Sequence, residues 1–262
     1  MARCHALTGE HSRLRLWTLT FFARYIEMPL LAWSYRLLRG RYRRLGQSRL
    51  VRAVLGWSLA APFGYLGDTA RPMPTPEVMR MIDSLEGPIA VGPCRCRSGH
   101  GGCNHPLETD IVIRTGVKAW SHAFPQEYRL VSQEEARQIV VECHRLGMWQ
   151  MVFIHCPVNQ ENEYVICNCC TCGCVPYILN RELGQRMYPL LRGEYASRTN
   201  LDRCTGHGEC VDACPFGSRA LEGGKVRMVR ACFGCGRCVA ACPEQAIEMV
   251  GNSVKCRDDT RR

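Results

Sequence analysis

The stretch Cys204–Pro243 carries one cysteine pattern twice. It begins with C-T-G-H-G-E-C-V-D-A-C-P at 204–215 and continues to C-F-G-C-G-R-C-V-A-A-C-P at 232–243. When the two copies are aligned (204 on 232), three cysteines, the proline and two glycines coincide. His207 stands in the first copy where the second copy has Cys235. The stretch therefore predicts a duplicated unit with cysteine ligands, and the rest of the chain is interpreted around it.

The second copy is the complete run C-x2-C-x2-C-x3-C-P, which binds [4Fe–4S] clusters in bacterial proteins. Residues 195–256 resemble the two-cluster bacterial ferredoxin domain, in which the fourth cysteine of each run binds the other cluster. The resemblance implies two [4Fe–4S] clusters. It assigns Cys232, Cys235, Cys238 and Cys214 to one, and Cys204, Cys210, Cys242 and His207 to the other. Ligation by His207 and a [3Fe–4S] cluster with His207 turned aside are both open. Zinc is disfavoured, because a duplicated run ending in C-P is not a zinc pattern.

A second set of cysteines lies upstream in two blocks. The first block holds Cys94, Cys96 and Cys103, and the second holds Cys167, Cys169, Cys170, Cys172 and Cys174. Eight thiols in such polar, turn-rich surroundings are too dense to be ordinary buried cysteines. We expect at least one further iron–sulfur cluster here, with a four-cysteine zinc site as the alternative. His100, His105 and Glu108 are near enough in sequence to be ligands, but each is more typical of a neighbouring or surface group.

The two blocks also support a wider resemblance. The pattern P-C-x-C-R … C-x-x-P-x-E, followed by I-C-N-C-C-x-C-x-C, resembles the N-terminal half of ferredoxin-like proteins of anaerobes. The resemblance covers about residues 75–256 and implies a cysteine-rich module ahead of a two-cluster domain. This chain departs from the pattern at Asp110 and Gly173, where a further cysteine is often found.

Composition places these cysteines in a reducing compartment. The chain has 19 cysteines, and no secretory signal is evident at its start. Cysteines at metal-ligand spacing in a chain that is not secreted indicate ligands rather than disulfides. We therefore expect a cytoplasmic protein, with a peripheral position on the inner face of the membrane as a further option.

The positive charge is concentrated in residues 1–67. Eleven arginines and two acids there give a net charge of +9, out of +10 for the whole chain. The longest uncharged run, Ala53–Gly67, is shorter than the roughly 20 residues of a membrane-spanning helix. Arginines alternating with large apolar side chains predict a basic amphipathic helical arm. Three interpretations are open: contact with a membrane surface, docking on a partner subunit, or coverage of the protein's own core.

The remaining pattern predicts an α+β fold in three parts. A small α/β cysteine-rich module at 75–192 separates the arm from a dicluster ferredoxin fold at 195–256. Three helices are expected in the cysteine-rich module. The first has Thr75 as its N-cap, the second begins at a capping box of Ser132 and Glu135, and the third follows Cys174. The expected strands are Ile89–Val91, Ile111–Arg114, Trp149–His155, Tyr195–Leu201, Lys225–Val229 and Ala246–Val250, with hairpin turns at 222–224 and 251–252.

The predicted function is single-electron transfer. The chain has no Walker A loop, no G-x-G-x-x-G after a strand and no nucleophile elbow, so we assign no catalytic residue. The leading hypothesis is a ferredoxin-like subunit that relays electrons within a larger redox complex. The alternatives are a reductase whose central cluster is the catalytic site, and an iron–sulfur redox sensor. Nucleic acid is disfavoured as a partner, because the arginines of the arm are interleaved with apolar residues and form no known DNA-binding spacing.

Overall fold

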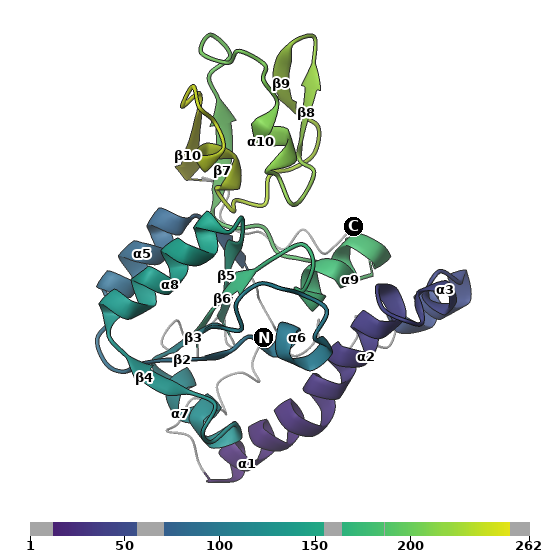
Figure 1. The fold of residues 1–262 in the computed structure, drawn as a ribbon, viewed down its shortest axis with the longest axis vertical. Coiled ribbons are helices and arrows are strands. Elements are labelled where there is room, and N and C mark those ends of the chain that lie inside the picture. The colour runs from purple at the N-terminus through teal and green to yellow at the C-terminus, as the bar shows by residue number, and fades with distance from the viewer. Residues whose placement is uncertain (1–12, 57–70, 155–163, 186, 252–262) are drawn as a thin grey trace, which may run out of the picture.

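The structure is a computed structural model that describes residues 13–56, 71–154, 164–185 and 187–251. A central sheet carries helices on its faces, the N-terminal helices run along one side, and the C-terminal segment extends beyond one end (Figure 1). Several predictions fall outside the described residues. They are both ends of the 1–67 arm, His155 at the end of its predicted strand, and the turn at 251–252 beyond Gly251.

Six antiparallel strands form the central sheet in the order β1-β5-β6-β3-β2-β4. Their bounds are β1 Arg71–Met73, β2 Ile89–Pro93, β3 Glu108–Ile113, β4 Arg129–Val131, β5 Trp149–Ile154 and β6 Tyr164–Cys169. Asp110 on β3 stands opposite Cys167 on β6. This register brings the end of β6, with the second cysteine block, close to the start of β3, which follows the first block.

Two helices cover one face of the sheet, α5 (Thr75–Asp83) and α8 (Gln133–Arg145). Buried apolar residues four apart on each helix, Val78 with Ile82 and Ala136 with Val140, pack against the strands. The predicted cap of α8 is confirmed, since the Ser132 hydroxyl accepts a hydrogen bond from the backbone N–H of Glu135.

The predicted start of α5 was wrong by one residue. Pro74 occupies the N-cap position and Thr75 is already helical. The Thr75 hydroxyl donates a hydrogen bond of 2.7 Å to the side-chain oxygen of buried Gln150 on β5. Its proton is therefore used for a tertiary contact and its side chain is not the helix cap.

Several elements lie where no element was predicted. They include β1, β4, β6, α6 (Arg95–His100) and α7 (Thr115–Ala123). Both α6 and β6 are built from cysteine-block residues, whose spacing was interpreted as ligand spacing alone. Residues Val165, Ile166 and Cys169 of β6 are buried in the sheet, so cysteines there serve as strand residues as well.

The N-terminal helices α1 (Arg13–Phe22) and α2 (Met28–Leu38) are joined by a π-helical segment, Ala23–Glu27. Leu31, Leu37 and Leu38 of α2 are buried against α9 (Val175–Leu183). The side chains of Trp17 and Trp33 are about half exposed or more, at 61% and 49%. One face of α2 thus covers the protein's own core, while the other face is open. None of the helices in the described ranges is long and apolar enough to cross a membrane.

The C-terminal segment contains two small antiparallel sheets and two short helices. β7 (Tyr195–Thr199) pairs with β10 (Ile247–Gly251), and β8 (Arg219–Glu222) forms a hairpin with β9 (Lys225–Met228). The helices are α10 (Glu209–Asp212) and α11 (Arg237–Ala240). The hairpin turn at 222–224 is as predicted. β10, which was expected in a hairpin with the turn at 251–252, pairs instead with β7 from the start of the segment.

Candidate metal centres

The two C-terminal cysteine loops need glycine at equivalent positions. Gly206 and Gly234 have φ angles of +79° and +86°. A Cβ on Gly206 would lie 2.0 Å from the carbonyl oxygen of Gly224, and one on Gly234 would lie 2.4 Å from that of Tyr195. Both loops therefore need a residue with no side chain, because the backbone is left-handed and tightly packed there.

Backbone N–H groups point at cysteine sulfurs in the same way in both copies. The N–H of Ser218 donates to Cys214 Sγ, and that of Ala246 donates to Cys242 Sγ, each at 3.3 Å. These pairs are equivalent when the copies are aligned. The N–H of Gly234 also donates to Cys232 Sγ, at 3.3 Å. Such bonds stabilise sulfur in its anionic form, as the ligands of an iron–sulfur cluster require.

Thiols of each run lie close to the fourth cysteine of the other run. Burial raises the pKa of Cys235, and the neighbouring charges of Cys214, Cys238 and Cys232 raise it further. Burial likewise raises the pKa of Cys210, with smaller contributions from Cys242 and Cys204. The chain thus brings the fourth cysteine of each run beside the other run.

Arg219 is close to one thiol of each set. Its guanidinium is buried, its Nη1 donates to Thr199 Oγ1 at 2.8 Å, and its Nη2 has no hydrogen-bond partner within the described part of the chain. Its positive charge opposes the upward pKa shift that burial imposes on Cys210 and on Cys238, one thiol from each set. A buried charge normally requires compensation, and anionic cluster ligands would supply it.

His207 is exposed. Its Nδ1 lies 3.2 Å from the hydroxyl of Thr205, in the loop before α10. Its role as a fourth ligand beside Cys204, Cys210 and Cys242 stays a prediction.

The eight central thiols separate into two groups and one remaining cysteine. The first group, here called the deep thiol set, consists of Cys94, Cys96, Cys169 and Cys174. These thiols lie close enough to shift one another's pKa: Cys96 raises the pKa of Cys94, Cys174 raises that of Cys96, and Cys169 raises that of Cys174. In each case the neighbouring thiol is the largest cause of the rise in pKa. Three of the four residues are buried, and Cys96 is partly buried.

The second group, here called the compact set, consists of Cys103, His105, Cys170 and Cys172. Its four ligand atoms all lie within 4.8 Å of one another. Burial opposes ionisation of Cys103, but hydrogen bonds from Cys172 and His105 outweigh it and lower its pKa to about 7. Sequence reasoning placed His105 among the neighbouring groups. The only available signal was its spacing two residues after Cys103, which matches that of Cys170 and Cys172.

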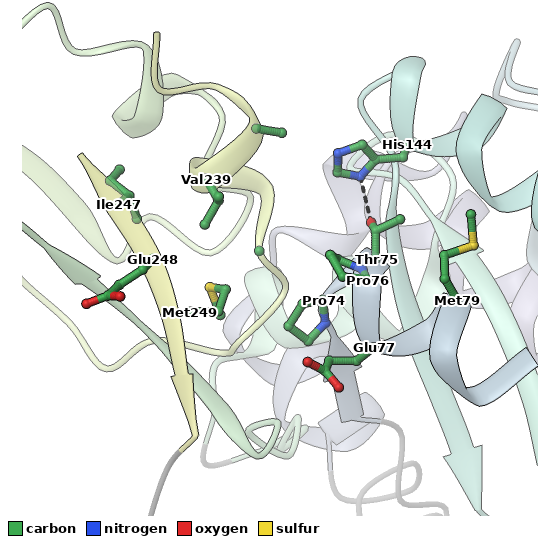
Figure 2. Close-up of a pocket in the computed structure, with 12 residues that line it drawn as sticks. Pro74, Thr75, Pro76, Glu77, Met79, His144, Val239, Ile247, Glu248 and Met249 are labelled. Carbon is green, nitrogen blue, oxygen red and sulfur yellow. Dashed lines mark hydrogen bonds between the residues drawn. The ribbon is translucent and has the colours of Figure 1, made fainter. Parts of the chain in front are cut away.

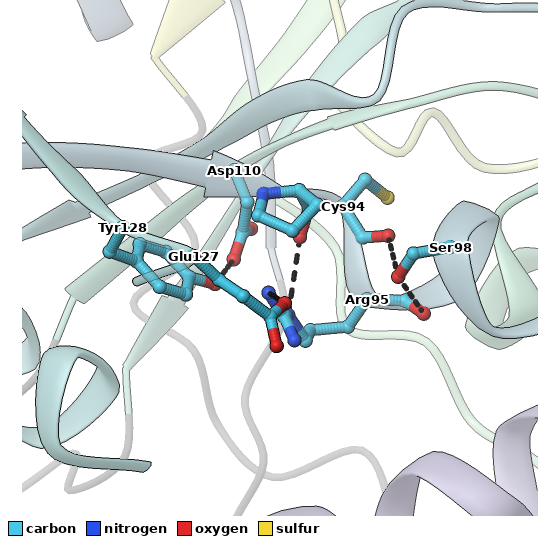
Figure 3. Close-up of polar contacts among 7 residues, drawn as sticks. Cys94, Arg95, Ser98, Asp110, Glu127 and Tyr128 are labelled. Carbon is cyan, nitrogen blue, oxygen red and sulfur yellow. Dashed lines mark hydrogen bonds and ion pairs between the residues drawn. The ribbon is translucent and has the colours of Figure 1, made fainter. Parts of the chain in front are cut away.

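The remaining cysteine, Cys167, contacts Asp110. Its thiol donates to Asp110 Oδ1 at 3.2 Å, and the Tyr128 hydroxyl donates to Asp110 Oδ2 at 2.6 Å. Figure 3 shows this carboxylate beside Arg95, at the start of α6. Burial raises the pKa of Asp110, while Tyr128 and Cys167 oppose that shift. The residue that replaces a frequent cysteine is therefore a buried hydrogen-bond acceptor beside the deep thiol set.

Arg97 connects the deep and compact sets. It is 1% exposed, and its Nη1 donates to the carbonyl oxygen of Asn168 at 2.9 Å and lies 3.8 Å from Cys170 Sγ. Its Nε has no partner among the described residues. Burial acts to lower the pKa of Arg97, but the neighbouring thiols Cys94 and Cys170 more than reverse this and raise it. The central module therefore resembles the C-terminal one in placing a buried arginine close to thiols of two groups.

The central and C-terminal thiols share one apolar core. Cys169 and Cys174 of the deep thiol set belong to the same buried cluster as Cys235. Trp149, Tyr177 and Phe216 are among the buried residues of this core, and Phe233 packs against it. Trp149 makes edge contacts with Tyr177 and with Phe216, at centroid distances of 5.1 and 5.7 Å, and Phe216 stacks on Phe233 at 4.4 Å.

A cavity of about 600 Å³ lies at the junction of the two modules. Figure 2 shows it between the start of α5 and the strand and helix that carry Ile247 and Val239. Beside it, Arg237 Nη1 donates to the carbonyl oxygen of His144 at the end of α8, at 2.7 Å. A positive charge at a helix C-terminus is favourable, so this contact fixes α11 and its Cys238 against the central module.

Comparison with known proteins identifies one part of the chain. Residues 228–248, which include Cys232, Cys235, Cys238 and Cys242, match the family described as 4Fe-4S binding domain. No curated protein and no solved structure matched the chain. Together with the cysteine pattern, the match makes this an iron–sulfur protein that binds at least one [4Fe–4S] cluster. A general role in electron transfer follows, because that is the usual chemistry of such clusters.

Proposed function

We propose that the chain is a ferredoxin-like electron-transfer subunit that relays single electrons among three iron–sulfur clusters. Two [4Fe–4S] clusters would be held in a dicluster ferredoxin fold at 195–256, one by Cys232, Cys235, Cys238 and Cys214, and the other by Cys204, Cys210 and Cys242. The cluster that includes Cys204 would have His207 as its fourth ligand, or it would contain three irons. The third would be held by Cys94, Cys96, Cys169 and Cys174.

The continuous core that joins the deep thiol set to Cys214 and Cys235 carries the proposal. Electron transfer between clusters slows steeply with distance, so a relay needs its centres close together and shielded from water. Cys169 and Cys174 pack in the same buried cluster as Cys235, with Trp149, Tyr177 and Phe216 among them. This supports an order of centres that runs from the central module through the Cys235 set to the Cys210 set.

The fit of each site to a cluster is supported by the chain's own groups. Backbone N–H groups donate to Cys214, Cys232 and Cys242. Arg97 and Arg219 bring buried positive charge next to the thiols. Each cluster, when bound, accepts or gives one electron, and these hydrogen bonds and charges set its potential.

The open face of the N-terminal helices is proposed to contact a redox partner within a larger complex. Trp17, Phe21 and Trp33 are exposed there, and arginines flank them along the chain. Replacement of Trp17 and Trp33 by Ser should release the chain from its complex without loss of iron. If the purified chain sedimented with anionic lipid vesicles through the same residues, a membrane surface would be the partner instead.

Iron and sulfide analysis of anaerobically purified protein tests the three-cluster proposal. Cys169→Ser or Cys174→Ser should remove about four irons per chain and leave the C-terminal clusters intact. Cys143→Ala is the matched control, because Cys143 is a buried thiol of the same module outside both central groups. Electron paramagnetic resonance of the dithionite-reduced protein should show magnetic coupling between clusters. The spectrum of either serine variant should be simpler, because one of the coupled clusters is missing. Unchanged iron and an unchanged spectrum would exclude the third cluster.

A further inference from the structure

The compact set has the dimensions of a site for a single metal ion. The sulfurs of Cys103 and Cys172 are 3.0 Å apart. The sulfur of Cys170 lies 3.6 Å from that of Cys103 and 3.5 Å from that of Cys172. The Nδ1 of His105 lies 3.2 Å from Cys103 Sγ and 3.3 Å from Cys172 Sγ. These five distances are edges of one small tetrahedron.

A tetrahedral zinc ion requires nearly these distances. Zn–S bonds of about 2.3 Å and Zn–N bonds of about 2.0–2.1 Å give edges of about 3.8 Å between sulfurs and about 3.6 Å from sulfur to nitrogen. The observed edges are shorter by no more than about 0.8 Å. A four-iron cluster spaces its cysteine sulfurs more widely, because the irons and sulfides stand between them. Within the described ranges, this is the one group of cysteines and histidine whose ligand atoms are mutually within 4.8 Å.

We propose that Cys103, His105, Cys170 and Cys172 bind one zinc ion in a structural site that is separate from the iron–sulfur clusters. Three cysteines and one histidine form a common ligand set of structural zinc sites, and zinc favours thiolate and imidazole ligands. This proposal goes beyond electron transfer and does not depend on a third cluster, because it uses none of the deep thiol set.

The surrounding chain holds the two ligand loops together. The ring of His100 accepts a hydrogen bond from the N–H of Gly102 at Nδ1, and its Nε2 therefore donates to the carbonyl oxygen of Gly173, each at 2.9 Å. His100 is thus a cross-link between the loops and not a ligand. Gly173 must lack a side chain, since its Cβ would lie 2.9 Å from the Cβ of Cys103.

Helix α2 adds a second support. The ring of Tyr35 stacks on His100 with centroids 3.6 Å apart and planes 6° from parallel. Its hydroxyl donates to the carbonyl oxygen of Gly102 at 3.0 Å. The loop between α6 and β3 contains no strand or long helix, so these contacts and the ion would fix its position.

Charge also fits a bound zinc ion. Zinc with three thiolates and a neutral imidazole carries a net charge of about −1. The buried guanidinium of Arg97 has its Nη1 3.8 Å from Cys170 Sγ and supplies an opposite charge.

Metal analysis of the full chain, purified anaerobically from medium containing both metals, tests the proposal. Wild-type protein should hold one zinc per chain, and zinc-edge X-ray absorption should show three sulfurs and one nitrogen. This readout needs no variant and so does not depend on folding of a mutant. Zinc coordinated by nitrogen and oxygen alone, or zinc well below one per chain, would overturn the proposal.

Two variants and one control sharpen the test. Cys172→Ala changes the exposed ligand and should remove the zinc while iron and sulfide stay at the wild-type level. His105→Cys should retain one zinc, now with four sulfurs, because four cysteines are also a structural zinc set. Cys143→Ala should change neither metal. Loss of iron in place of zinc from Cys172→Ala would assign the compact set to a cluster.

Discussion

The hydroxyl of Tyr177 donates a hydrogen bond of 2.6 Å to the carbonyl oxygen of Pro215. Tyr177 follows Cys174 by three residues, and Pro215 comes directly after Cys214. The bond therefore joins a ligand loop of the central module to a ligand loop of the C-terminal repeat. Tyr177 is buried in the shared apolar core, so the bond helps to fix the relative position of the two cysteine groups.

Tyr177→Phe should weaken this junction. The ring is kept, but a partly buried carbonyl loses its donor, which costs about 1–3 kcal/mol in apparent free energy of unfolding. Anaerobic urea denaturation followed by far-ultraviolet circular dichroism measures the loss. Tyr25→Phe is the control, since Tyr25 is 67% exposed, and it should change stability by less than about 0.5 kcal/mol. Equal effects of the two variants would contradict a structural role for the Tyr177 bond.

Arg219→Met should lower the reduction potentials of both C-terminal clusters. Removal of a buried positive charge makes the added electron less stable, by roughly 1–3 kcal/mol, or roughly 40–130 mV for one electron. Redox titration followed by electron paramagnetic resonance, on samples checked for full iron content, provides the measurement.

Arg198→Met is the matched control for that change. Arg198 lies on β7 and forms an exposed ion pair with Glu248. Its removal should leave both potentials nearly unchanged, because solvent screens an exposed charge. A shift in only one cluster with Arg219→Met would mean that this arginine is not close to both.

His207→Cys should alter only the cluster that includes Cys204. If the imidazole is a ligand, exchange for an anionic thiolate lowers the potential of that cluster at constant iron. If the site holds three irons, the variant should gain about one iron per chain. His122→Cys, on α7 in the central module, controls for an added thiol. Unchanged iron and unchanged potentials would show that His207 neither binds nor tunes the cluster.

Leu37→Ala should test how far the N-terminal helices belong to the core. Leu37 is 1% exposed and packs with α9, so its truncation should cost about 2–5 kcal/mol. Leu14→Ala makes the same change at a side chain that is 72% exposed, and the cost should be within about 0.5 kcal/mol. Urea denaturation compares the two. Similar small losses would show that the arm does not pack on the central module.

The periodic and local features of the fold were accessible from the sequence. The cap at Ser132, the turn at 222–224 and the strands around 89–91, 111–114 and 225–229 follow from patterns within a few neighbouring residues. The strand β6 was missed, because its cysteines were interpreted as ligands while its apolar neighbours are few. Helix α5 begins one residue earlier than predicted, because the Thr75 hydroxyl donates a hydrogen bond to Gln150, which is 75 residues away in sequence.

The ligand loops of the C-terminal repeat were determined by the sequence itself, although the fourth cysteine of each run lies beside the other run. Each run holds its cysteines at fixed short spacing with glycine at the tight positions, so local geometry directs the thiols inward. The partition of the central thiols was decided by tertiary structure alone. The two blocks are some sixty residues apart, and pairing of β3 with β6 determines which thiols meet. With that register, Cys167 lies beside Asp110, and Cys169 and Cys174 lie near Cys96. Cys170 and Cys172 then lie beside Cys103 and His105. Spacing along a chain specifies a site when its ligands share a loop, and strand pairing specifies it when they do not.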